Sequence, residues 1–482
     1  MIAARARPGL AFTACFATLL AGCVAGPNYV RPPVETPPAW KLEAPWRAAV
    51  PDDAAPKGPW WERFGDARLD ALQRQALAQS PTLAVASARF EQARAVARAT
   101  SAGLLPTASL GLRAARSRIS PNRPLSSYSS SNFETVQNDF VPALSVGYEI
   151  DLAGRIRRSV EGAQASAEQS AADLENVRLL LGTDLATAYF NLRATDIELD
   201  VLARSIALQR RSLDFVSTRH DLGAASGLDV AQQQALLDTT LTQVDVLLRQ
   251  RSGFEHAIAT LTGTPAPSFT LAADISELEP PAVPLGVPSD VLQRRPDVAS
   301  AERAMAAANA QIGVAKAAYY PSIVLAPGVG FESNSLSTLL EAPSRLWSIG
   351  ASVTQPLFSG GRLGANVDFA QAGYDATVGN YRLVVLDAMQ EVEDGITGLA
   401  DLERANAQAR TAVETARRVL DLANARYEGG ATTYLDVITA QQSLLAAERL
   451  SAQLGGQRLL TAVFLIKALG GGWQVPAALA TR

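Results

Sequence analysis

The sequence has few of the side chains on which enzyme chemistry and metal binding depend. Its 482 residues include two His and two Cys, and aromatic residues make up only 6%. The formal net charge is −4, whereas a nucleic-acid-binding protein normally shows a basic patch or a high pI. These shortages argue against an enzyme, a metal site and a nucleic-acid partner. We therefore expect no catalytic residue, no metal and no cofactor.

Long apolar runs are also missing beyond the N-terminus. The chain after Cys23 has no run of about 18 apolar residues, so we expect no transmembrane helix. Arg5 and Arg7 precede an apolar stretch at residues 10–20, which is too short to cross a bilayer as a helix. A basic start followed by a short apolar stretch is typical of a secretory signal peptide, here residues 1–22.

The end of that signal resembles a bacterial lipobox, the acylation site of lipoproteins. Small residues stand directly before the cysteine in Leu20-Ala21-Gly22-Cys23. We predict that Cys23 is lipidated, and two or more acyl chains would anchor the protein stably. An ordinary signal peptide cut nearby is the alternative. Residue 24 is Val rather than Asp, which favours the outer membrane in the bacterial sorting pattern.

The chain is a tandem duplication. Residues 219–230 recur as residues 426–437, and the two halves align without a gap from Arg155 and Arg362 onward. Each half is expected to contain a helix, two strands, a long helix and a returning helix. The predicted domains are a signal peptide (1–22), a lipid-anchored segment (23–65), a first repeat (66–263), a Pro-rich linker (264–288), a second repeat (289–470) and a tail (471–482).

Within each repeat the predicted elements follow one order. The helices are expected at 66–104, 155–221 and 228–262, and again at 289–320, 362–428 and 435–469. The strands are expected near 106–118 and 140–152, and again near 321–332 and 346–357. The helices 155–221 and 362–428 contain no Pro and would each be about 100 Å long. Helices of that length are typical of a coiled-coil or tubular assembly rather than a globular domain.

The predicted strands alternate between apolar and small or polar residues. In the second strand the apolar residues are Phe140, Leu144, Val146, Tyr148, Ile150 and Leu152. This alternation over about ten residues fits a transmembrane β-strand between lipid and a wet lumen, and the export signal favours it. A half-buried strand of a soluble sheet would alternate as well. Four strands cannot close a barrel in lipid, so several copies would have to share one, with eight strands from two copies or twelve from three.

In combination, the order of elements and several motifs resemble the TolC-type outer membrane factors, and more closely their lipoprotein branch, the OprM/NodT-like efflux channels. The motifs are the lipobox with Gly26-Pro27-Asn28-Tyr29; Trp60-Trp61-x-x-Phe64-x-Asp66; Arg295-Pro296-Asp297-Val298; Gln355-Pro356-Leu357-Phe358-Ser359-Gly360-Gly361-Arg362; and Arg426-Tyr427-x-x-Gly430 with Leu435-Asp436-Val437. They cover nearly all of residues 20–470.

The resemblance implies a mixed fold of long periplasmic α-helices and four transmembrane β-strands per chain. It implies a homotrimer with a twelve-stranded barrel and an α-helical tunnel, lipid-anchored in the bacterial outer membrane and extending into the periplasm. The partners would be outer membrane lipid, a periplasmic adaptor and an inner-membrane pump of the RND type. The function would be a passive duct for drugs or toxic small solutes. A type I protein secretion duct and a non-conducting periplasmic scaffold lipoprotein remain the alternatives.

The resemblance also suggests a gate at the periplasmic tip. Asp436 matches the first of two acidic positions that ring the constriction, and Tyr427 matches a residue of the polar network that holds the closed state. The second acidic position is Thr439 here, which puts a double acidic ring in doubt. A plainer interpretation makes Asp436 a helix N-terminal residue stabilised by the helix dipole, the role we expect of Asp229.

Overall fold

The computed structural model describes residues 24–33, 37, 40, 59–118, 136–276, 279–281, 283 and 294–471. The signal peptide and Cys23 lie outside the described residues. The chain divides into two compact units, each assembled from three segments. The first unit comprises Met1–Pro32, Glu91–Gln169 and Glu302–Asn380, and the second comprises Pro33–Phe90, Ser170–Ala301 and Tyr381–Arg482.

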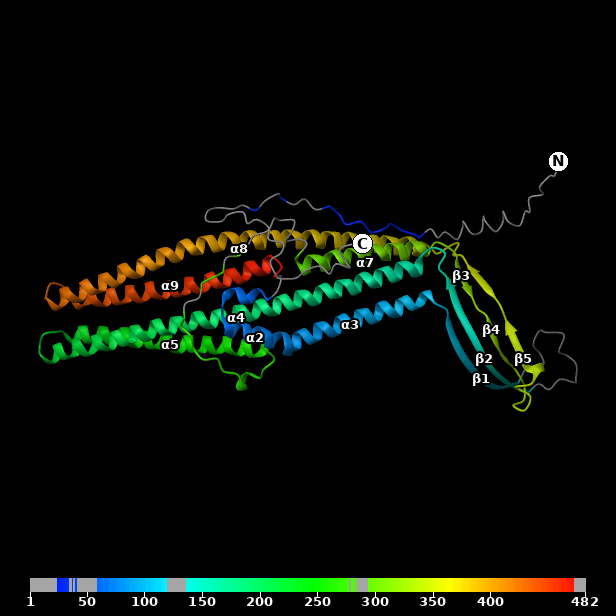
Figure 1. Ribbon diagram of the computed structural model, residues 1–482, viewed down its shortest axis with the longest axis horizontal. Coiled ribbons are helices and arrows are strands. Elements are labelled where there is room, and N and C mark those ends of the chain that lie inside the picture. The colour runs from blue at the N-terminus through cyan, green and yellow to red at the C-terminus, as the bar shows by residue number, and fades with distance from the viewer. Residues whose placement is uncertain are drawn as a thin grey trace. The chain divides into compact units, whose positions relative to one another are not determined.

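The first unit contains an antiparallel sheet (Figure 1). Its elements are β1 (Thr107–Arg118), β2 (Val136–Ile150), β3 (Ser322–Leu325), β4 (Gly328–Phe331), β5 (Arg345–Ser348) and β6 (Ala351–Thr354). β1 pairs with β2, β2 pairs with both β3 and β4, and these pair in turn with β6 and β5. Among the described residues, the sheet is therefore made of four antiparallel strands in chain order, two of which are interrupted.

The interruptions correct two predicted strands. The strand expected near 321–332 is split into β3 and β4, because Pro327 has no N–H to donate to a neighbouring strand. Its carbonyl still accepts a hydrogen bond from the Val146 N–H at 2.9 Å. The strand expected near 346–357 is split into β5 and β6 at Ile349-Gly350, where the Gly350 carbonyl accepts from the Ala326 N–H at 2.9 Å. The sheet therefore continues across both breaks.

The second strand is also displaced relative to its prediction. β2 begins at Val136 rather than near residue 140, because residues 136–139 extend the ladder with β1. It ends at Ile150 rather than 152, because the Asp151 side chain is used to start the following helix. That carboxylate accepts hydrogen bonds from the Ile156 and Arg157 N–H groups at 3.0 and 2.9 Å.

Apolar side chains of this sheet are left uncovered in the single chain. More than half of the surface of Leu110, Leu112, Val329, Trp347 and Val353 is exposed. Exposed apolar patches of this kind mark contacts with a membrane or a partner. The sheet thus carries an apolar surface that the described residues do not cover.

The largest difference between the predicted and observed helices is in the first repeat. The single helix expected over 66–104 is two helices, α2 (Ala67–Gln79) and α3 (Pro81–Ser101), followed by the short turn η2 (Ala102–Leu104). Ser80 between them is extended, because a residue before proline is disfavoured in helical conformation. Pro81 then occupies the first position of α3, where its missing N–H is tolerated. In the second repeat, α7 (Pro296–Ala317) is shorter than the predicted 289–320 at its described end.

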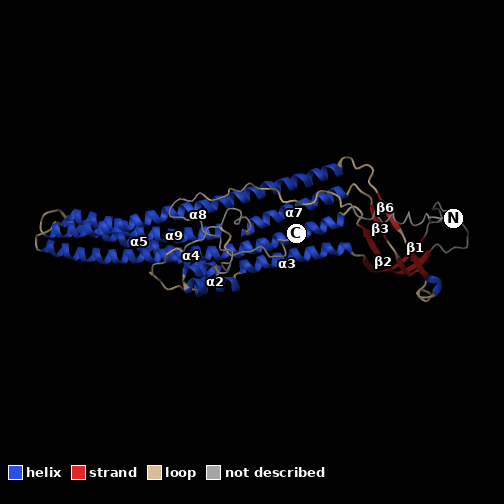
Figure 2. Cartoon of the chain, turned by 45° about the horizontal axis from the view of Figure 1, so that its top comes forward, coloured by secondary structure: helices blue, strands red, loops and turns tan. Residues whose placement is uncertain are grey.

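The long helices have the predicted bounds. They are α4 (Arg155–Asp221) and α8 (Arg362–Glu428), each of 67 residues, followed by α5 (Gly227–Leu261) and α9 (Tyr434–Ala468) (Figures 1 and 2). The start of each returning helix is one residue earlier than predicted. In the part of the chain that the structure describes, no helix has both the length and the apolarity needed to cross a membrane.

An aromatic cluster forms the core of the second unit and explains one of the sequence motifs. Trp60, Trp61 and Phe64 of the short helix η1 (Trp60–Phe64) are buried against Tyr189 and Phe190 of α4. Asp66, the last residue of the motif, caps α2 through the Arg68 and Leu69 N–H groups. Its other carboxylate oxygen accepts from the Tyr189 hydroxyl at 2.6 Å and from Arg193 at 3.0 Å.

A second buried arginine explains the Arg295-Pro296-Asp297 motif in the same unit. Arg295 is 5% exposed and donates to Asp297 and to Glu391 of α8, each at 2.6 Å. It also donates to the carbonyl of Ala468 at the end of α9, at 3.1 Å. The guanidinium therefore ties the start of α7 to both helices of the second hairpin.

In the first unit, the segment that directly follows Cys23 is bound to α4 and α7. The Arg158 side chain of α4 donates to the Ala25 carbonyl at 3.2 Å and to the Asn28 side chain at 2.8 Å. Tyr29 donates to Glu302 of α7 at 2.6 Å. These contacts account for the Gly26-Pro27-Asn28-Tyr29 motif and hold the segment, which we call the N-terminal strap (residues 24–31), in one place.

Candidate gate at the helix tips

Two helical hairpins of the second unit end in turns of the same design. α4 and α5 are joined by residues 222–226, and α8 and α9 by residues 429–433. Each turn contains a glycine in the left-handed region, Gly223 with φ 77° and Gly430 with φ 71°. In each, the next N–H returns to the helix, from Ala224 to the Arg219 carbonyl and from Ala431 to the Arg426 carbonyl. This is a common way to end a helix.

The two turns differ in how the returning helix begins. α5 has a capping box: Ser226 accepts from the Asp229 N–H at 3.2 Å, and Asp229 accepts from the Ser226 N–H at 3.1 Å. At α9 the equivalent Thr433 makes no side-chain cap, although Asp436 stands three residues later. The Asp436 carboxylate instead accepts a hydrogen bond from the Thr432 hydroxyl. Asp229 is therefore held at its helix end, whereas Asp436 is turned toward Thr432, the residue before the helix cap.

Asp436 and Thr439 lie on the exposed side of α9. The Thr439 hydroxyl donates to the Leu435 carbonyl of its own helix at 2.8 Å. Among the described residues, neither side chain is hydrogen-bonded to Tyr427. The three predicted gate residues are thus near one another in the chain, but the structure places Tyr427 on a different, buried side of the hairpin.

Tyr427 is 9% exposed and has aromatic and cationic neighbours. Its ring centre is 5.0 Å from that of Tyr434 at the start of α9. The Arg219 guanidinium of α4 lies 5.0 Å from the centre of the same ring, within the range of a cation–π contact. The Tyr427 hydroxyl is hydrogen-bonded to no residue that the structure describes. Tyr427 therefore joins the tips of the two hairpins through its ring.

Near the turns, Tyr434 and two glutamines make hydrogen bonds that join the two hairpins. The Tyr434 hydroxyl donates to Gln233 Oε1 of α5 at 2.9 Å. Gln233 Nε2 donates to the Gln209 carbonyl of α4 at 3.1 Å and to Gln441 Oε1 of α9 at 3.3 Å. Gln441 Nε2 in turn donates to the Ser212 hydroxyl of α4 at 2.8 Å. We call these residues the tip network.

The tip network is buried. Tyr434 and Gln441 are each 2% exposed and Gln233 is 0% exposed. Burial, together with the negative charge that Tyr427 and Asp229 could carry nearby, raises the pKa of Tyr434, so the hydroxyl keeps its proton and donates at neutral pH. The surrounding side chains are apolar: Val216, Leu236, Leu420, Val437, Ile438 and Leu444. In such surroundings each lost hydrogen bond is costly, because the partner left behind has no access to water.

One pattern in the sequence indicates this network. Tyr434, Val437, Ile438 and Gln441 follow the spacing of one helix face, on which Gln441 is the polar exception. A glutamine within an apolar stripe indicates a buried polar contact. The partner residue, Gln233, could not be identified in this way, because it lies in a run of three glutamines.

Comparison with known proteins assigns a family to these features. The sequence profile described as "Outer membrane efflux protein" matches residues 72–264 and 287–471. The chain is 32% identical over 457 residues to the pyoverdine export outer membrane protein OpmQ of Pseudomonas aeruginosa, covering 95% of each protein. It is 33% identical over 465 residues to the toluene efflux pump outer membrane protein TtgF of Pseudomonas putida, covering 94% of this chain and 95% of that protein.

The fold is likewise similar to that of a solved channel. The structure of the outer-membrane channel OprN superimposes with a TM-score of 0.86 at 29% sequence identity. The superposition covers 94% of this chain and 100% of the OprN chain. The resemblance seen in the sequence motifs is confirmed in both the sequence profile and the fold.

Proposed function

This chain belongs to the outer membrane efflux protein family, and we propose that it works as a homotrimer whose periplasmic tip is gated by the tip network. The family consists of passive outer membrane channels of efflux systems and is not an enzyme family. The chain is accordingly the outer membrane duct of a tripartite efflux system. Its oligomeric state, gate, lipid anchor and cargo are the parts that we propose.

The open edges of the sheet support assembly from several copies. Among the described residues, β1 pairs only with β2, and β5 and β6 have one unpaired edge each. Unpaired backbone N–H and C=O groups are not tolerated in the hydrocarbon of a bilayer, so each edge must find a partner strand. A neighbouring copy offers such an edge, and three copies would close a twelve-stranded barrel with the exposed Leu110, Leu112 and Trp347 toward lipid.

The N-terminal strap supports lipidation of Cys23. Residues 24–31 directly follow this cysteine in the sequence, and Arg158 of α4 donates hydrogen bonds to Ala25 and Asn28. Acyl chains on Cys23 would therefore lie close to the sheet, which is the part of the chain proposed to enter the membrane. A lipid anchor at the end of a long flexible tether would not be positioned in this way.

The gate proposal rests on the contrast between buried and exposed residues at the tip. Tyr434, Gln233 and Gln441 bind α9 to the α4–α5 hairpin, so separating the hairpins would break these hydrogen bonds. Asp436 is exposed and is not used as a helix cap. In a trimer, three such carboxylates would repel one another where they approach, and cations would relieve that repulsion.

The proposed partners are a periplasmic adaptor and an inner-membrane pump of the RND type, and the proposed cargo is drugs or toxic small solutes. The relatives OpmQ and TtgF are named for export of pyoverdine and efflux of toluene, both small molecules. This supports small-solute efflux over the alternative of a protein secretion duct.

Single-channel recording of the lipidated protein in a planar bilayer tests the duct and its gate. We expect a small, cation-selective conductance from the wild type and a larger one from Asp436→Ala. Asp229→Ala is the matched control, because its carboxylate is held in the capping box, and it should leave both the conductance and the cation selectivity unchanged. A wild-type conductance unaffected by Asp436→Ala would refute the role of Asp436, and an oligomeric sample that never conducts would refute the duct.

A further inference from the structure

The pairing of the strands gives the sheet of the first unit two chemically different faces. β1 is paired with β2 along its whole length, so alternate residues of each strand lie on opposite faces. Leu110 is paired with Leu144. Val329 of β4 is paired with Leu144 on one side and with Trp347 of β5 on the other. These four exposed apolar side chains therefore share one face, which we call the apolar face.

The charged residues of the described strands are divided between the two faces. The face opposite the apolar face carries Arg113, Asp139 and Glu149. There Arg113 pairs with Asp139 at 2.5 Å. The remaining charged residues of the described strands are arginines on the apolar face: Arg116, Arg118 and Arg345. In the described strands, the apolar face thus carries positive charge and no negative charge.

These three arginines lie at the end of the sheet away from the adjoining helices (Figure 1). β1 begins at Thr107, soon after α3, and ends at Arg118, whereas β5 begins at Arg345, where the chain returns from that end. An extended strand rises about 3.4 Å per residue, so Arg116 lies roughly 27 Å along β1 from Ala108. This is close to the apolar band of about 25 Å in outer membrane barrels. Since members of this family extend into the periplasm on the helix side, the arginine end of the sheet meets the outer leaflet.

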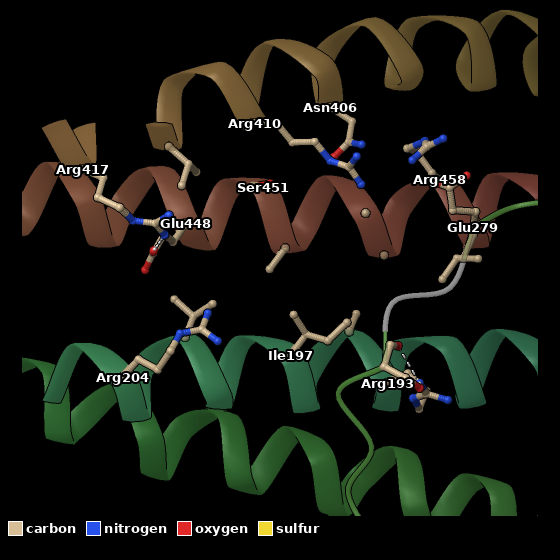
Figure 3. A pocket seen from close by; sticks show the side chains of 18 residues that line it. Arg193, Ile197, Arg204, Glu279, Asn406, Arg410, Arg417, Glu448, Ser451 and Arg458 are labelled. Carbon is tan, nitrogen blue, oxygen red and sulfur yellow. Dashed lines mark hydrogen bonds and ion pairs between the residues drawn. The ribbon is translucent and has the colours of Figure 1, made fainter. Parts of the chain in front are cut away.

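The arginines of the apolar face are exposed and make no hydrogen bond or ion pair with any residue that the structure describes. Arginines elsewhere have acidic partners. At the helix end of the sheet, Arg155 pairs with Glu149 at 2.7 Å. In the second unit, Figure 3 shows Arg417 of α8 beside Glu448 of α9, with which it pairs at 2.7 Å. Adjacent positive charges repel each other, and an anion between them relieves the repulsion, so the apolar face indicates an anion from outside the chain.

The spacing of the arginines narrows the class of anion. Successive side chains on one face of a strand are about 7 Å apart, so Arg116 and Arg118 can each bind a separate anionic group. Guanidinium groups bind phosphate through two parallel hydrogen bonds. The same face continues toward the helices with Leu112 and Leu110, which suits an anion that carries acyl chains. A lipid with more than one phosphate on its head group meets both requirements.

We propose that Arg116 and Arg118 bind the phosphates of lipid A, the phosphorylated glycolipid of the outer leaflet. Each guanidinium donates to one phosphate, and the acyl chains lie along Leu110 and Leu112. β1 and β5 are at opposite edges of the sheet, so closing the proposed trimeric barrel would bring β5 of one copy, which carries Arg345, beside β1 of the next. The contribution of Arg345 rests on that trimer, whereas Arg116 and Arg118 belong to one chain.

Native mass spectrometry of the full-length lipidated protein in detergent micelles tests the site, because one spectrum gives both the oligomeric state and the number of bound lipid molecules. The titrated lipids are diphosphoryl lipid A, monophosphoryl lipid A and phosphatidylglycerol. We expect diphosphoryl lipid A to bind at least about tenfold more tightly than either lipid with one phosphate. Equal affinities for the three lipids would overturn the assignment. A monomeric protein that still prefers diphosphoryl lipid A would refute the trimer and not the site on β1.

Substitutions on the two faces of β1 locate the binding. The double substitution Arg116→Gln and Arg118→Gln should lower the affinity for diphosphoryl lipid A at least about tenfold and leave that for phosphatidylglycerol nearly unchanged. Arg113→Gln, on the opposite face of the same strand, is the control and should bind as the wild type does. Wild-type affinity in the double variant, or an equal loss in Arg113→Gln, would refute the lipid site.

A third variant tests the neighbouring copy. Arg345→Gln should weaken binding of diphosphoryl lipid A about threefold in the trimer, and wild-type affinity in this variant would refute the contribution of Arg345. If the double variant fails to assemble, the preference of the wild type for two phosphates over one decides the proposal.

Discussion

Removing the Tyr434 hydroxyl should weaken the contact between α9 and the α4–α5 hairpin. Tyr434→Phe keeps the ring and its 5.0 Å contact with Tyr427 but deletes the donor that satisfies Gln233 Oε1. Gln233 is 0% exposed, so water cannot replace the lost hydroxyl without a rearrangement. The substitution therefore removes the bond to Gln233 Oε1 and the longer one, 3.4 Å, to the Ser212 carbonyl, and it leaves the remaining bonds of both glutamines in place.

The size of the effect follows from the unsatisfied acceptor. Leaving a buried polar group without its partner costs about 1–3 kcal/mol. If opening of the tip breaks this hydrogen bond in the wild type, the cost falls only on the closed state. Since about 1.4 kcal/mol corresponds to a factor of ten, the ratio of open to closed tips should rise roughly tenfold in each protomer.

Open probability in single-channel recordings measures this ratio directly. Tyr189→Phe provides the matched control, because Tyr189 is also fully buried and donates to a carboxylate, Asp66, away from the tip. Both variants should lower the melting temperature, but only Tyr434→Phe should raise the open probability. An equal increase in both variants, or a destabilised Tyr434→Phe with wild-type gating, would refute the tip network as the gate.

Three further predictions concern the anchor, the strap and the pH response. Mass spectrometry of the mature protein should find acyl chains on Cys23; Cys23→Ala should abolish them, and Cys15→Ala, within the signal peptide, should not. Arg158→Met should weaken the strap by about 2 kcal/mol and speed amide exchange at residues 24–31 on the order of 30-fold, while Arg157→Met, an exposed neighbour, should not. Although burial opposes ionisation of Glu391, Arg295 and Lys467 keep its pKa below the ordinary 4.5. The ionised carboxylate should therefore contribute its full stabilisation of the folded protein above pH 4.5, and this contribution should fall as the pH drops through the lowered pKa. The free energy of unfolding of Glu391→Gln should accordingly fall less at low pH than that of the wild type. The same pH dependence in both proteins would contradict this.

The elements that were predicted correctly are those whose signals are local. Both long helices contain no proline and are followed by a glycine-containing turn. Their predicted bounds, at Arg155, Asp221, Arg362 and Glu428, match the structure. The misplaced elements also had local signals. Pro81 and Pro327 stand inside a predicted helix and a predicted strand, and each interrupts its element in the way that a missing N–H and a restricted neighbour require.

The candidate gate was harder to predict, because its contacts join distant segments. Tyr427 and Asp436 were selected by their resemblance to a known family, and their roles remain predictions. The predicted gate residues do not include Tyr434, which lies between Tyr427 and Asp436 in the chain. Its partner Gln233 is 201 positions away, and only the packing of one hairpin against the other brings the two side chains together.

The two turns show how duplication can give one motif two uses. Ser226 with Asp229 and Thr433 with Asp436 have the same spacing, which in both places predicts a capping box. The box forms only in the first repeat. There the residue before the cap is Ala225, whereas in the second repeat it is Thr432, whose hydroxyl donates to one oxygen of the Asp436 carboxylate. The acidic side chain is thus held at the helix end in the first repeat and turned toward Thr432 in the second, and only the second is proposed to meet its copies at the tip.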